Sequence, residues 1–185
     1  MENSPVKVIN QAKLSIIQGD ITQQTTEAIV NAANSSLMGG GGVDGAIHRA
    51  GGPAILEECK QIVSRQGRLP TGQAVITTAG NMKTKHVIHT VGPIWHGGSQ
   101  GEAELLSSAY RESLKLAAEN NLTSISFPSI STGAYGYPID EASRIALKTV
   151  ASFLSEPSST KEVVFVLFDS RTFDAFSSAL QEIKE

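Results

Sequence analysis

The chain has 185 residues, of which 40% are hydrophobic and 18% charged, and its formal net charge is −3 at pH 7. These values are typical of a globular domain with a real hydrophobic core, so we expect a single domain spanning residues 1–185. Because the chain is acidic and only 5% aromatic, direct nucleic-acid binding is not expected. An anionic ligand would have to be held mainly by backbone amides.

Cysteine content and hydropathy bear on the cellular location. Cys59 is the only cysteine, so no disulfide can form within the chain, and its apolar, helically spaced neighbours favour a buried structural thiol over a nucleophile. No apolar run is long enough to cross a bilayer, and Met1–Pro5 has neither the basic start nor the apolar core of a signal peptide. We therefore expect a cytoplasmic protein that does not bind membranes.

The first half of the chain combines short apolar runs with two helical patterns. The turn residues Asn10-Gln11 and Gly80-Asn81 separate apolar runs and predict strands on either side, and Pro53 suits the first position of a helix. In order, we predict strands at Val6–Ile9, Leu14–Gln18 and Ala28–Ala33, helices at Val43–Ala50 and Pro53–Gln66, and strands at Ala74–Thr78 and His86–Val91.

The second half alternates helices and strands. Its helical segments carry apolar residues every three or four positions, and the run Val163–Leu167 is typical of a strand buried on both faces. The alternation implies parallel strands covered by helices, while the early strands make the sheet mixed. The predicted fold class is therefore α/β, a three-layer α/β/α sandwich with a mixed central sheet. The predicted elements are Glu102–Asn120 (helix), Ser124–Ile130 (strand), Pro138–Leu154 (helix), Glu162–Phe168 (strand) and Arg171–Lys184 (helix).

Four polar or glycine-rich segments follow predicted strands or open just after one. In open α/β sheets, ligands bind beyond the carboxyl ends of the strands. We therefore expect these segments to gather along one edge of the sheet and to form a ligand site there. The segments are Gly19–Thr22, Asn31–Gly45, Ser129–Gly136 and Asp169–Arg171.

The segment Gly39–Gly45 contains four consecutive glycines followed by an acid. Glycine lets a ligand approach the main chain closely, and free N–H groups at a helix start suit a phosphate. Our hypothesis is that the loop holds a diphosphate while Asp44 acts on a group attached beyond it; capping of the following helix is the alternative. Asn34 can orient a hydroxyl or a water without adding charge. His48, one turn after Asp44, is predicted to be a packed or hydrogen-bonded helix residue.

The same glycines spell G-x-G-x-x-G at Gly40, Gly42 and Gly45, the pattern of dinucleotide-binding folds. That pattern should follow a strand directly and precede a strand-end acid by about 20 residues. Glu57 and Glu58 instead lie inside a predicted helix, which disfavours a dehydrogenase fingerprint. A Walker A loop is excluded, because no Gly-Lys-Ser/Thr follows.

Two further polar segments fit the same site. Ser131–Gly136 offers amides and hydroxyls for a second wall around a diphosphate, and Tyr135 is placed to lie against a ribose; an ordinary strand-to-helix turn is the alternative. Asp20, at a strand end, can accept a hydrogen bond from an exocyclic amino group or cap the following turn.

Neither metal nor serine chemistry is predicted. His86 and His89 are three residues apart in a strand and therefore point to opposite faces, so we predict no metal site and no cofactor. The serines show no G-x-S-x-G nucleophile elbow, which disfavours a serine hydrolase.

Four motifs in this order closely resemble the macrodomain family, and within it the MacroD-type branch, which includes bacterial O-acetyl-ADP-ribose deacetylases. The resemblance runs from about Leu14 to Phe168 and implies a single macrodomain with an ADP-ribose site. The motifs are Gly19–Thr22, Asn31–Asn34, Gly39–Gly45 with Ile47–Arg49, and Ser131–Gly136.

The resemblance also implies roles for individual residues. Asp20 would bind the adenine amino group with Ile21 beside the ring, either Phe168 or Arg171 would cover the adenine, and Tyr135 would flank the distal ribose. The diphosphate would be held by Gly41, Gly42, Val43, Ser131, Thr132, Gly133 and Ala134.

Asn34 and Asp44 match the catalytic residues of the branch, whereas pure readers of ADP-ribose often lack the acid. The implied activity is hydrolysis of esters on the distal ribose: deacetylation of O-acetyl-ADP-ribose and removal of mono-ADP-ribose from Asp or Glu of proteins. ADP-ribose, O-acetyl-ADP-ribose and mono-ADP-ribosylated proteins are the expected partners. Two other functions stay open, a non-catalytic ADP-ribose reader and a regulator of an RNA-processing enzyme.

Overall fold

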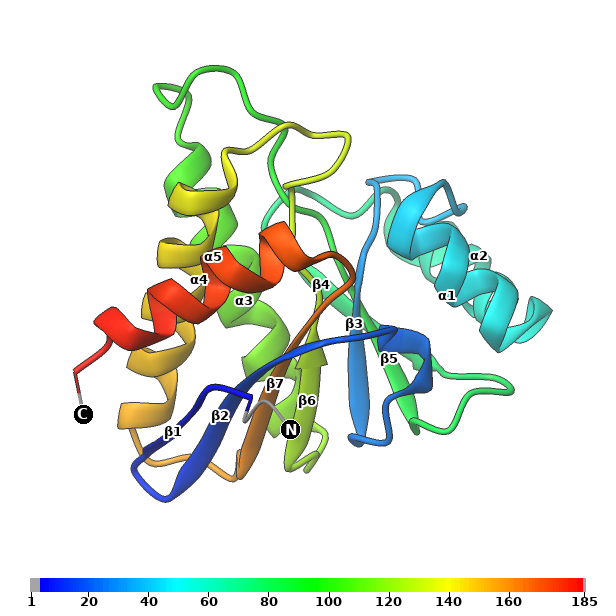
Figure 1. The fold of residues 1–185 in the computed structure, drawn as a ribbon. Helices are drawn as coiled ribbons and strands as arrows, with labels where there is room; N and C mark the ends of the chain where they lie inside the picture. Colours follow the sequence, from blue (N-terminus) through cyan, green and yellow to red (C-terminus); the bar gives the residue numbers. More distant parts are fainter. Residues whose placement is uncertain (1–3, 185) are drawn as a thin grey trace.

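A computed structural model describes residues 4–184, so the segment Met1–Pro5, where no signal peptide is expected, lies partly outside the described residues. The chain forms one seven-stranded sheet with helices on both sides (Figure 1). The strands are β1 (Val6–Ile9), β2 (Ala12–Gln18), β3 (Ala28–Ala32), β4 (Ala74–Thr78), β5 (His86–Thr90), β6 (Ser124–Phe127) and β7 (Glu162–Leu167). The helices are η1 (Ile21–Gln23), α1 (Gly42–Gly51), α2 (Pro53–Gln66), α3 (Glu102–Glu119), α4 (Ile139–Ser155) and α5 (Ser170–Glu182).

Every predicted strand and helix is present, and the differences lie at the ends of elements. Strand β6 ends at Phe127 rather than at Ile130, because Pro128 follows and has no N–H to continue the ladder. The short 3-10 helix η1 was not predicted. It forms because Oδ1 of Asp20 accepts a hydrogen bond from the backbone N–H of Thr22 at 2.9 Å and caps the turn.

The strand order is β1-β2-β7-β6-β3-β5-β4. β1 and β4 are antiparallel to their neighbours and the other pairs are parallel, so the sheet is mixed as expected. The chain leaves β3 toward β5 on one side and leaves β6 toward β7 on the other. The boundary between β3 and β6 is therefore a topological switch point, the place where ligands bind in open α/β sheets.

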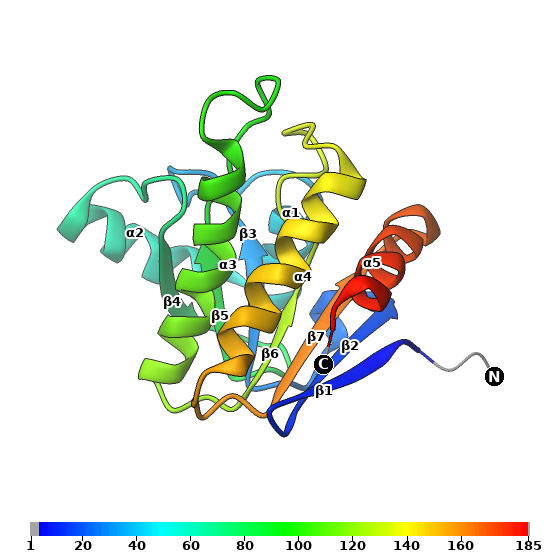
Figure 2. The same cartoon turned by 90° about the vertical axis from the view of Figure 1, so that its left-hand side faces the viewer.

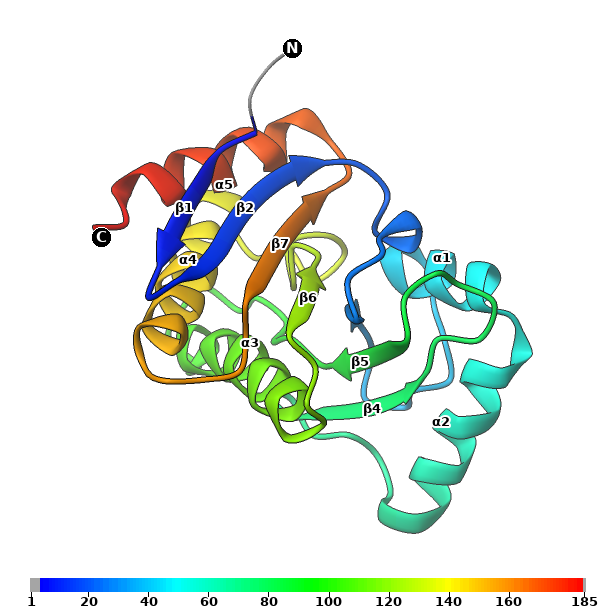
Figure 3. The same cartoon turned by 90° about the horizontal axis from the view of Figure 1, so that it is seen from below.

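Two helical layers cover the sheet (Figures 2 and 3). Helices α1 and α2 pack on one face, and α3, α4 and α5 pack on the other. Alternation along β3 sends Ala28 and Val30 into the core under α3–α5 and Ile29 into the core under α1–α2. Asn31, two residues after Ile29, therefore faces α1. Across residues 4–184, no helix combines the length and the apolar character needed to span a bilayer.

Candidate functional site

A cavity of about 310 Å³ lies beyond the carboxyl ends of β3 and β6. The loop after β3, the start of α1 and the loop after β6 form its walls, so the two predicted glycine- and serine-rich segments do meet. Most of the predicted site residues line it: Asn34, Gly41, Gly42, Val43, Asp44, Ser131, Gly133, Ala134 and Tyr135.

Three predicted site residues do not line this cavity. The Thr132 hydroxyl bonds within its own loop, 2.6 Å from the Ser129 hydroxyl. Asp20 is exposed at the end of β2, where it caps η1, so its capping role is present while a contact with adenine stays a prediction. Ile21 is only 6% exposed and packs in the core under α1–α2.

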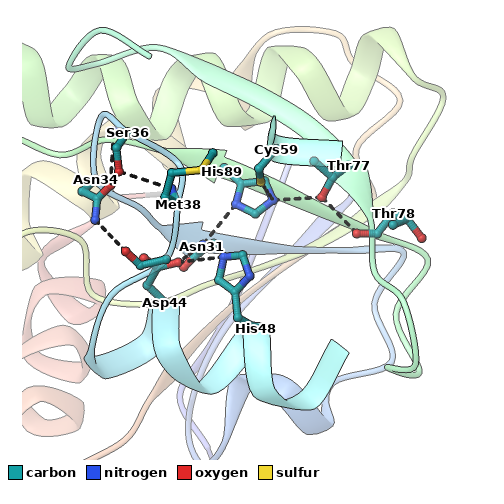
Figure 4. A network of polar contacts seen from close by, with 11 residues as sticks. Asn31, Asn34, Ser36, Met38, Asp44, His48, Cys59, Thr77, Thr78 and His89 are labelled. Carbon is teal, nitrogen blue, oxygen red and sulfur yellow. Dashed lines mark hydrogen bonds and ion pairs between the residues drawn. The ribbon is translucent and has the colours of Figure 1, made fainter. Parts of the chain in front are cut away.

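Asp44 is buried at the start of α1, and its carboxylate turns toward the sheet rather than toward the helix end (Figure 4). Helix α1 begins after Gly41 with no side-chain cap, so the alternative that Asp44 caps this helix is wrong. Its Oδ1 instead accepts a hydrogen bond from Nδ2 of Asn31 at 2.8 Å. The same oxygen lies 3.3 Å from Nε2 of His48, which places His48 as the paired helix residue that was expected.

The second oxygen of Asp44 remains available. Within the described residues, Oδ2 has no hydrogen-bond partner. A Cβ at Gly40 would lie 3.2 Å from this oxygen and 3.4 Å from Nδ2 of Asn34. Glycine at position 40 thus keeps open the space between the acid and the amide, enough for a small group such as a water.

The amide of Asn34 fixes the start of the glycine-rich loop. Its Nδ2 donates to the carbonyl of Gly39 at 3.0 Å, and its Oδ1 accepts from the N–H and the hydroxyl of Ser36 at 3.2 and 2.6 Å. The loop and the acid are therefore held by neighbouring side chains of one segment, Asn31–Asn34, at the end of β3.

A buried polar chain behind Asp44 was missed by the sequence analysis. Nδ2 of Asn31 lies 3.0 Å from Nδ1 of His89, and Nε2 of His89 lies 2.9 Å from the hydroxyl of Thr77 (Figure 4). Asn31 and His89 are register partners on the parallel strands β3 and β5. The signal in the sequence was Asn31, a polar residue inside the apolar run 28–33. That His89 is its partner follows only from the register of the two strands.

Burial dictates the charge state of the groups behind the acid. Desolvation, and to a smaller extent the nearby His48, lowers the pKa of His89 to about 3, so this imidazole is neutral at pH 7. Burial, together with the charges of Asp44 and Glu58, raises the pKa of Cys59 to about 11. Cys59 is fully buried, which confirms the predicted structural thiol.

The loop after β6 is held in a strained shape. Ser131 has a positive φ of 69°, and its buried hydroxyl has no partner among the residues described. The hydroxyl of Tyr110 accepts from the N–H of Ile130 at 3.1 Å, and the N–H of Trp95 donates to the carbonyl of Tyr135 at 2.9 Å. A loop braced from two sides in a strained conformation is typical of a binding site.

An exposed aromatic residue follows the strand next to the one that Asp20 follows. Phe168 follows β7 and is 83% exposed, while the N–H of Gly19 donates to the carbonyl of Leu167 at 2.9 Å. Because β2 and β7 are paired, the exposed ring and the Asp20 carboxylate, whose Oδ1 caps η1, follow adjacent strands at the same edge of the sheet. Across residues 4–184, no three His, Cys, Asp or Glu side chains are grouped so that they could hold a metal ion.

A mixed α/β sheet whose switch-point cleft joins two amide-rich loops to one buried acid defines a class of domains suited to phosphorylated ligands. The chain belongs to the Macro domain family, whose model matches residues 30–146. The predicted membership of the macrodomain family is confirmed.

Relatives of known name cover nearly the whole chain. A macro domain-containing protein of Caldanaerobacter subterraneus is 62% identical over 171 residues, covering 92% of this chain and 97% of that protein. An O-acetyl-ADP-ribose deacetylase of Salmonella newport is 55% identical over 171 residues, covering 92% and 96%. One of Klebsiella pneumoniae is 58% identical over 157 residues, covering 85% and 90%.

Solved structures share the fold. A mutant of the Oceanobacillus iheyensis macrodomain with ADPR has a TM-score of 0.93 at 47% identity, and the match covers 97% of both chains. The Trypanosoma brucei macrodomain in complex with ADP-ribose has a TM-score of 0.83 at 37% identity, covering 90% of this chain and 68% of that one. The predicted fold class, a macrodomain-like α/β sandwich, is confirmed.

Proposed function

We propose that this protein binds ADP-ribose and hydrolyses esters on its distal ribose, as an O-acetyl-ADP-ribose deacetylase. The observation that carries the proposal is the Asp44 carboxylate, which is fixed at one oxygen by Asn31 and free at the other, beside a cleft walled by two backbone loops. Relatives that carry the name O-acetyl-ADP-ribose deacetylase are 52% to 58% identical to this chain.

Backbone amides are the groups proposed to hold the diphosphate. Helix α1 starts without a side-chain cap, so its first N–H groups, around Gly42 and Val43, remain available and carry the positive end of the helix dipole. The strained loop Ser131–Ala134 faces them across the cavity. None of the described residues lining the cavity is Lys or Arg, so the main chain is left to balance the charge.

The ends of β2 and β7 are the proposed adenine site. Asp20 would accept from the exocyclic amino group, and the exposed ring of Phe168 would stack on the base. Ile21, packed in the core, would support this end of the site from below. Phe168 is preferred to Arg171 because its aromatic ring is 83% exposed, so stacking on the adenine would remove a large apolar surface from water.

Asp44 and Asn34 are the proposed catalytic pair. Binding energy from the adenine and diphosphate, remote from the reaction, would hold the ester next to the free Oδ2 of Asp44. Asn34 would orient a water in the space that Gly40 leaves open, and Asp44 would accept its proton. The water oxygen bonds to the ester carbonyl carbon, the bond from that carbon to the ribose oxygen breaks, the proton passes to the ribose oxygen, and ADP-ribose and a carboxylic acid leave.

The same bond links ADP-ribose to Asp or Glu side chains, so mono-ADP-ribosylated proteins are proposed as further substrates. The whole chain is proposed to act as a single macrodomain, since strands β1, β2 and β7 outside residues 30–146 belong to the same sheet. The cytoplasm is the proposed location, where the free thiol of Cys59 would stay reduced.

Replacing Asp44 tests the function directly. We expect Asp44→Ala to lower the turnover of O-acetyl-ADP-ribose by roughly 10²–10⁴-fold. The Kd for ADP-ribose should change much less, because an acid adds little attraction for an anion. Acetate release and calorimetric titration measure the two quantities. Glu57→Ala, which removes an exposed acid on α2, is the control with unchanged turnover.

Three outcomes would contradict the proposal. Full turnover in Asp44→Ala would remove the acid from the mechanism. Binding of ADP-ribose by the unaltered protein without release of acetate would favour a reader. Absence of binding would favour the regulator of an RNA-processing enzyme, with a protein partner outside this cleft.

A further inference from the structure

The buried imidazole of His89 lies behind the acid, only 1% exposed, and is not among the residues that line the cavity. We propose that His89 is a positioning residue, which acts through the amide of Asn31 to orient the Asp44 carboxylate. The inference rests on the proposed function, because it presumes that Asp44 does the chemistry. His89 itself touches no substrate.

The orientation of the Asn31 amide follows from its neighbours. Its Nδ2 lies 2.8 Å from Oδ1 of Asp44 and 3.0 Å from Nδ1 of His89. If the amide were turned over, its own oxygen would face the carboxylate oxygen, acceptor against acceptor. Nδ2 therefore faces both groups and donates one hydrogen to each, which uses both of its hydrogens.

This arrangement fixes the tautomer of His89. Because Nδ1 accepts from Asn31, the ring hydrogen must be on Nε2, which donates to the hydroxyl of Thr77 at 2.9 Å. That hydroxyl in turn donates to the carbonyl of Thr78 at 2.9 Å. Donation therefore runs outward from the Asn31 amide, to Asp44 on one side and through His89 and Thr77 to the carbonyl of Thr78 on the other. Since burial keeps His89 neutral, it acts as a fixed acceptor and does not relay protons.

The acceptor supplied by His89 decides which way the Asn31 amide turns. Oδ1 of Asn31 is buried and has no hydrogen-bond partner in the described part of the chain. Nothing on that side therefore holds the amide. Without Nδ1 of His89, one buried N–H of the amide would lose its partner, and the hydrogen bond to Asp44 alone would hold the amide. The carboxylate would then lose the shorter of the two contacts at Oδ1, those with Asn31 and His48, which keep its other oxygen toward the cleft.

A pair of substitutions at His89 separates positioning from packing. His89→Leu removes the acceptor, whereas His89→Asn can place its amide oxygen where Nδ1 lies. We expect His89→Leu to lower kcat for O-acetyl-ADP-ribose by about tenfold or more, with the Kd for ADP-ribose within about twofold. His89→Asn should recover most of kcat. Cys59→Ala is the packing control, because Sγ lies 3.9 Å from Nε2 of the same ring, while the Asn31 side chain bonds to Nδ1 and, within residues 4–184, has no hydrogen bond with Cys59.

A double mutant tests whether His89 acts through the acid. In the Asp44→Ala background, His89→Leu should lower kcat no further, because there is no carboxylate left to orient. Equal loss of kcat in folded His89→Leu and His89→Asn proteins would overturn the positioning role, and so would a wild-type kcat in His89→Leu. It would also be overturned if His89→Leu lowered kcat in the Asp44→Ala background by the same factor as in the wild type. Failure of the proposed function appears separately, as full turnover in Asp44→Ala alone.

Thr77 gives a second route if His89→Leu does not fold. Thr77→Val keeps the shape of the side chain and removes the acceptor for Nε2, while Thr77→Ser keeps the hydroxyl. We expect Thr77→Val to lower kcat by about threefold to tenfold and Thr77→Ser to keep more activity. Melting temperatures of all variants show whether each protein is folded. Equal kcat in the two Thr77 variants counts against the proposal.

Discussion

The two faces of the sheet are built differently. Under α3–α5, the core contains a cluster of buried aromatic rings, with Phe165 at its centre and its ring centroid 5.3 to 5.9 Å from those of Phe127, Tyr110 and Phe176. Under α1–α2, the buried residues include the polar side chains Asn31, Thr77 and His89. The sheet thus carries an aromatic cluster on one face, over β6 and β7, and a hydrogen-bonded polar chain on the other, on β3, β4 and β5.

This difference separates stability from function. Close packing of large rings is the main source of stability in a domain of this size. Burying Oδ1 of Asn31, which has no hydrogen-bond partner within residues 4–184, costs about 1–3 kcal/mol. This cost is explained if the Asn31 amide serves to hold Asp44 in the site and not to stabilise the core. Substitutions on the α3–α5 face should therefore change the free energy of unfolding, and those behind Asp44 should change turnover.

The largest effect on stability is expected at the centre of the aromatic cluster. Phe165→Ala leaves a cavity where the ring is fully buried and should lower the free energy of unfolding by about 3–5 kcal/mol. Because the cavity lies beyond the carboxyl ends of the strands and Phe165 does not line it, kcat of the folded protein should stay near the wild-type value. Urea unfolding and acetate release at low temperature measure the two effects.

Phe168 provides a matched control, since the same substitution three residues away removes an exposed ring. Phe168→Ala should change the free energy of unfolding by less than about 0.5 kcal/mol. Loss of kcat in folded Phe165→Ala protein would break the comparison, because the two faces would then be coupled.

A smaller effect is expected for ligand affinity at Phe168. If its ring stacks on the adenine, Phe168→Ala should weaken ADP-ribose binding by about 1–3 kcal/mol, at least fivefold in Kd, without changing kcat at saturation. Phe168→Tyr keeps the ring and should bind normally. Arg171→Ala tests the other candidate and should change Kd by less than about twofold. The assignment is contradicted if Arg171→Ala weakens binding more than Phe168→Ala does.

The sequence predicted the elements and the cleft because both depend on local chemistry. Proline before a helical pattern fixed the start of α2, and apolar alternation fixed the strands. Consecutive glycines followed by Asp44 indicated a backbone cradle with an acid, and in the structure both line one cavity. The resemblance then supplied the family, which composition and periodicity alone would not have done.

The polar chain behind the acid was not predictable in the same way. Asn31 and His89 are 58 residues apart, and only the register of β3 against β5 brings them together. The positive φ of Ser131 is likewise imposed by the surrounding loops, since serine has no preference for it. Long-range pairing, and not residue type, determines both features.

A second carboxylate is buried above the other face, and it is held by backbone instead of side chains. Glu102, at the start of α3, is 1% exposed and accepts from the N–H groups of His96, Gly98 and Gln100 at 2.9, 2.9 and 2.6 Å. Burial alone would raise the pKa of Glu102, but these hydrogen bonds outweigh it and lower the pKa to about 2. The loop it holds includes Trp95, whose N–H supports the loop after β6.

The smallest predicted effect is the pH dependence that Glu102 causes. Because its folded pKa lies below the ordinary value of 4.5, the stabilisation is complete above pH 4.5 and is lost as the pH falls toward about 2. Glu102→Gln should lower the melting temperature at pH 7 and flatten its decline across this window. The part that remains is due to Glu27, whose pKa is also about 2, and to Asp169, whose pKa is lowered by hydrogen bonds from Thr172. Glu104→Gln, at an exposed site, should leave the curve unchanged. Parallel curves for the wild type and Glu102→Gln would show that the backbone hydrogen bonds to this carboxylate do not depend on its charge.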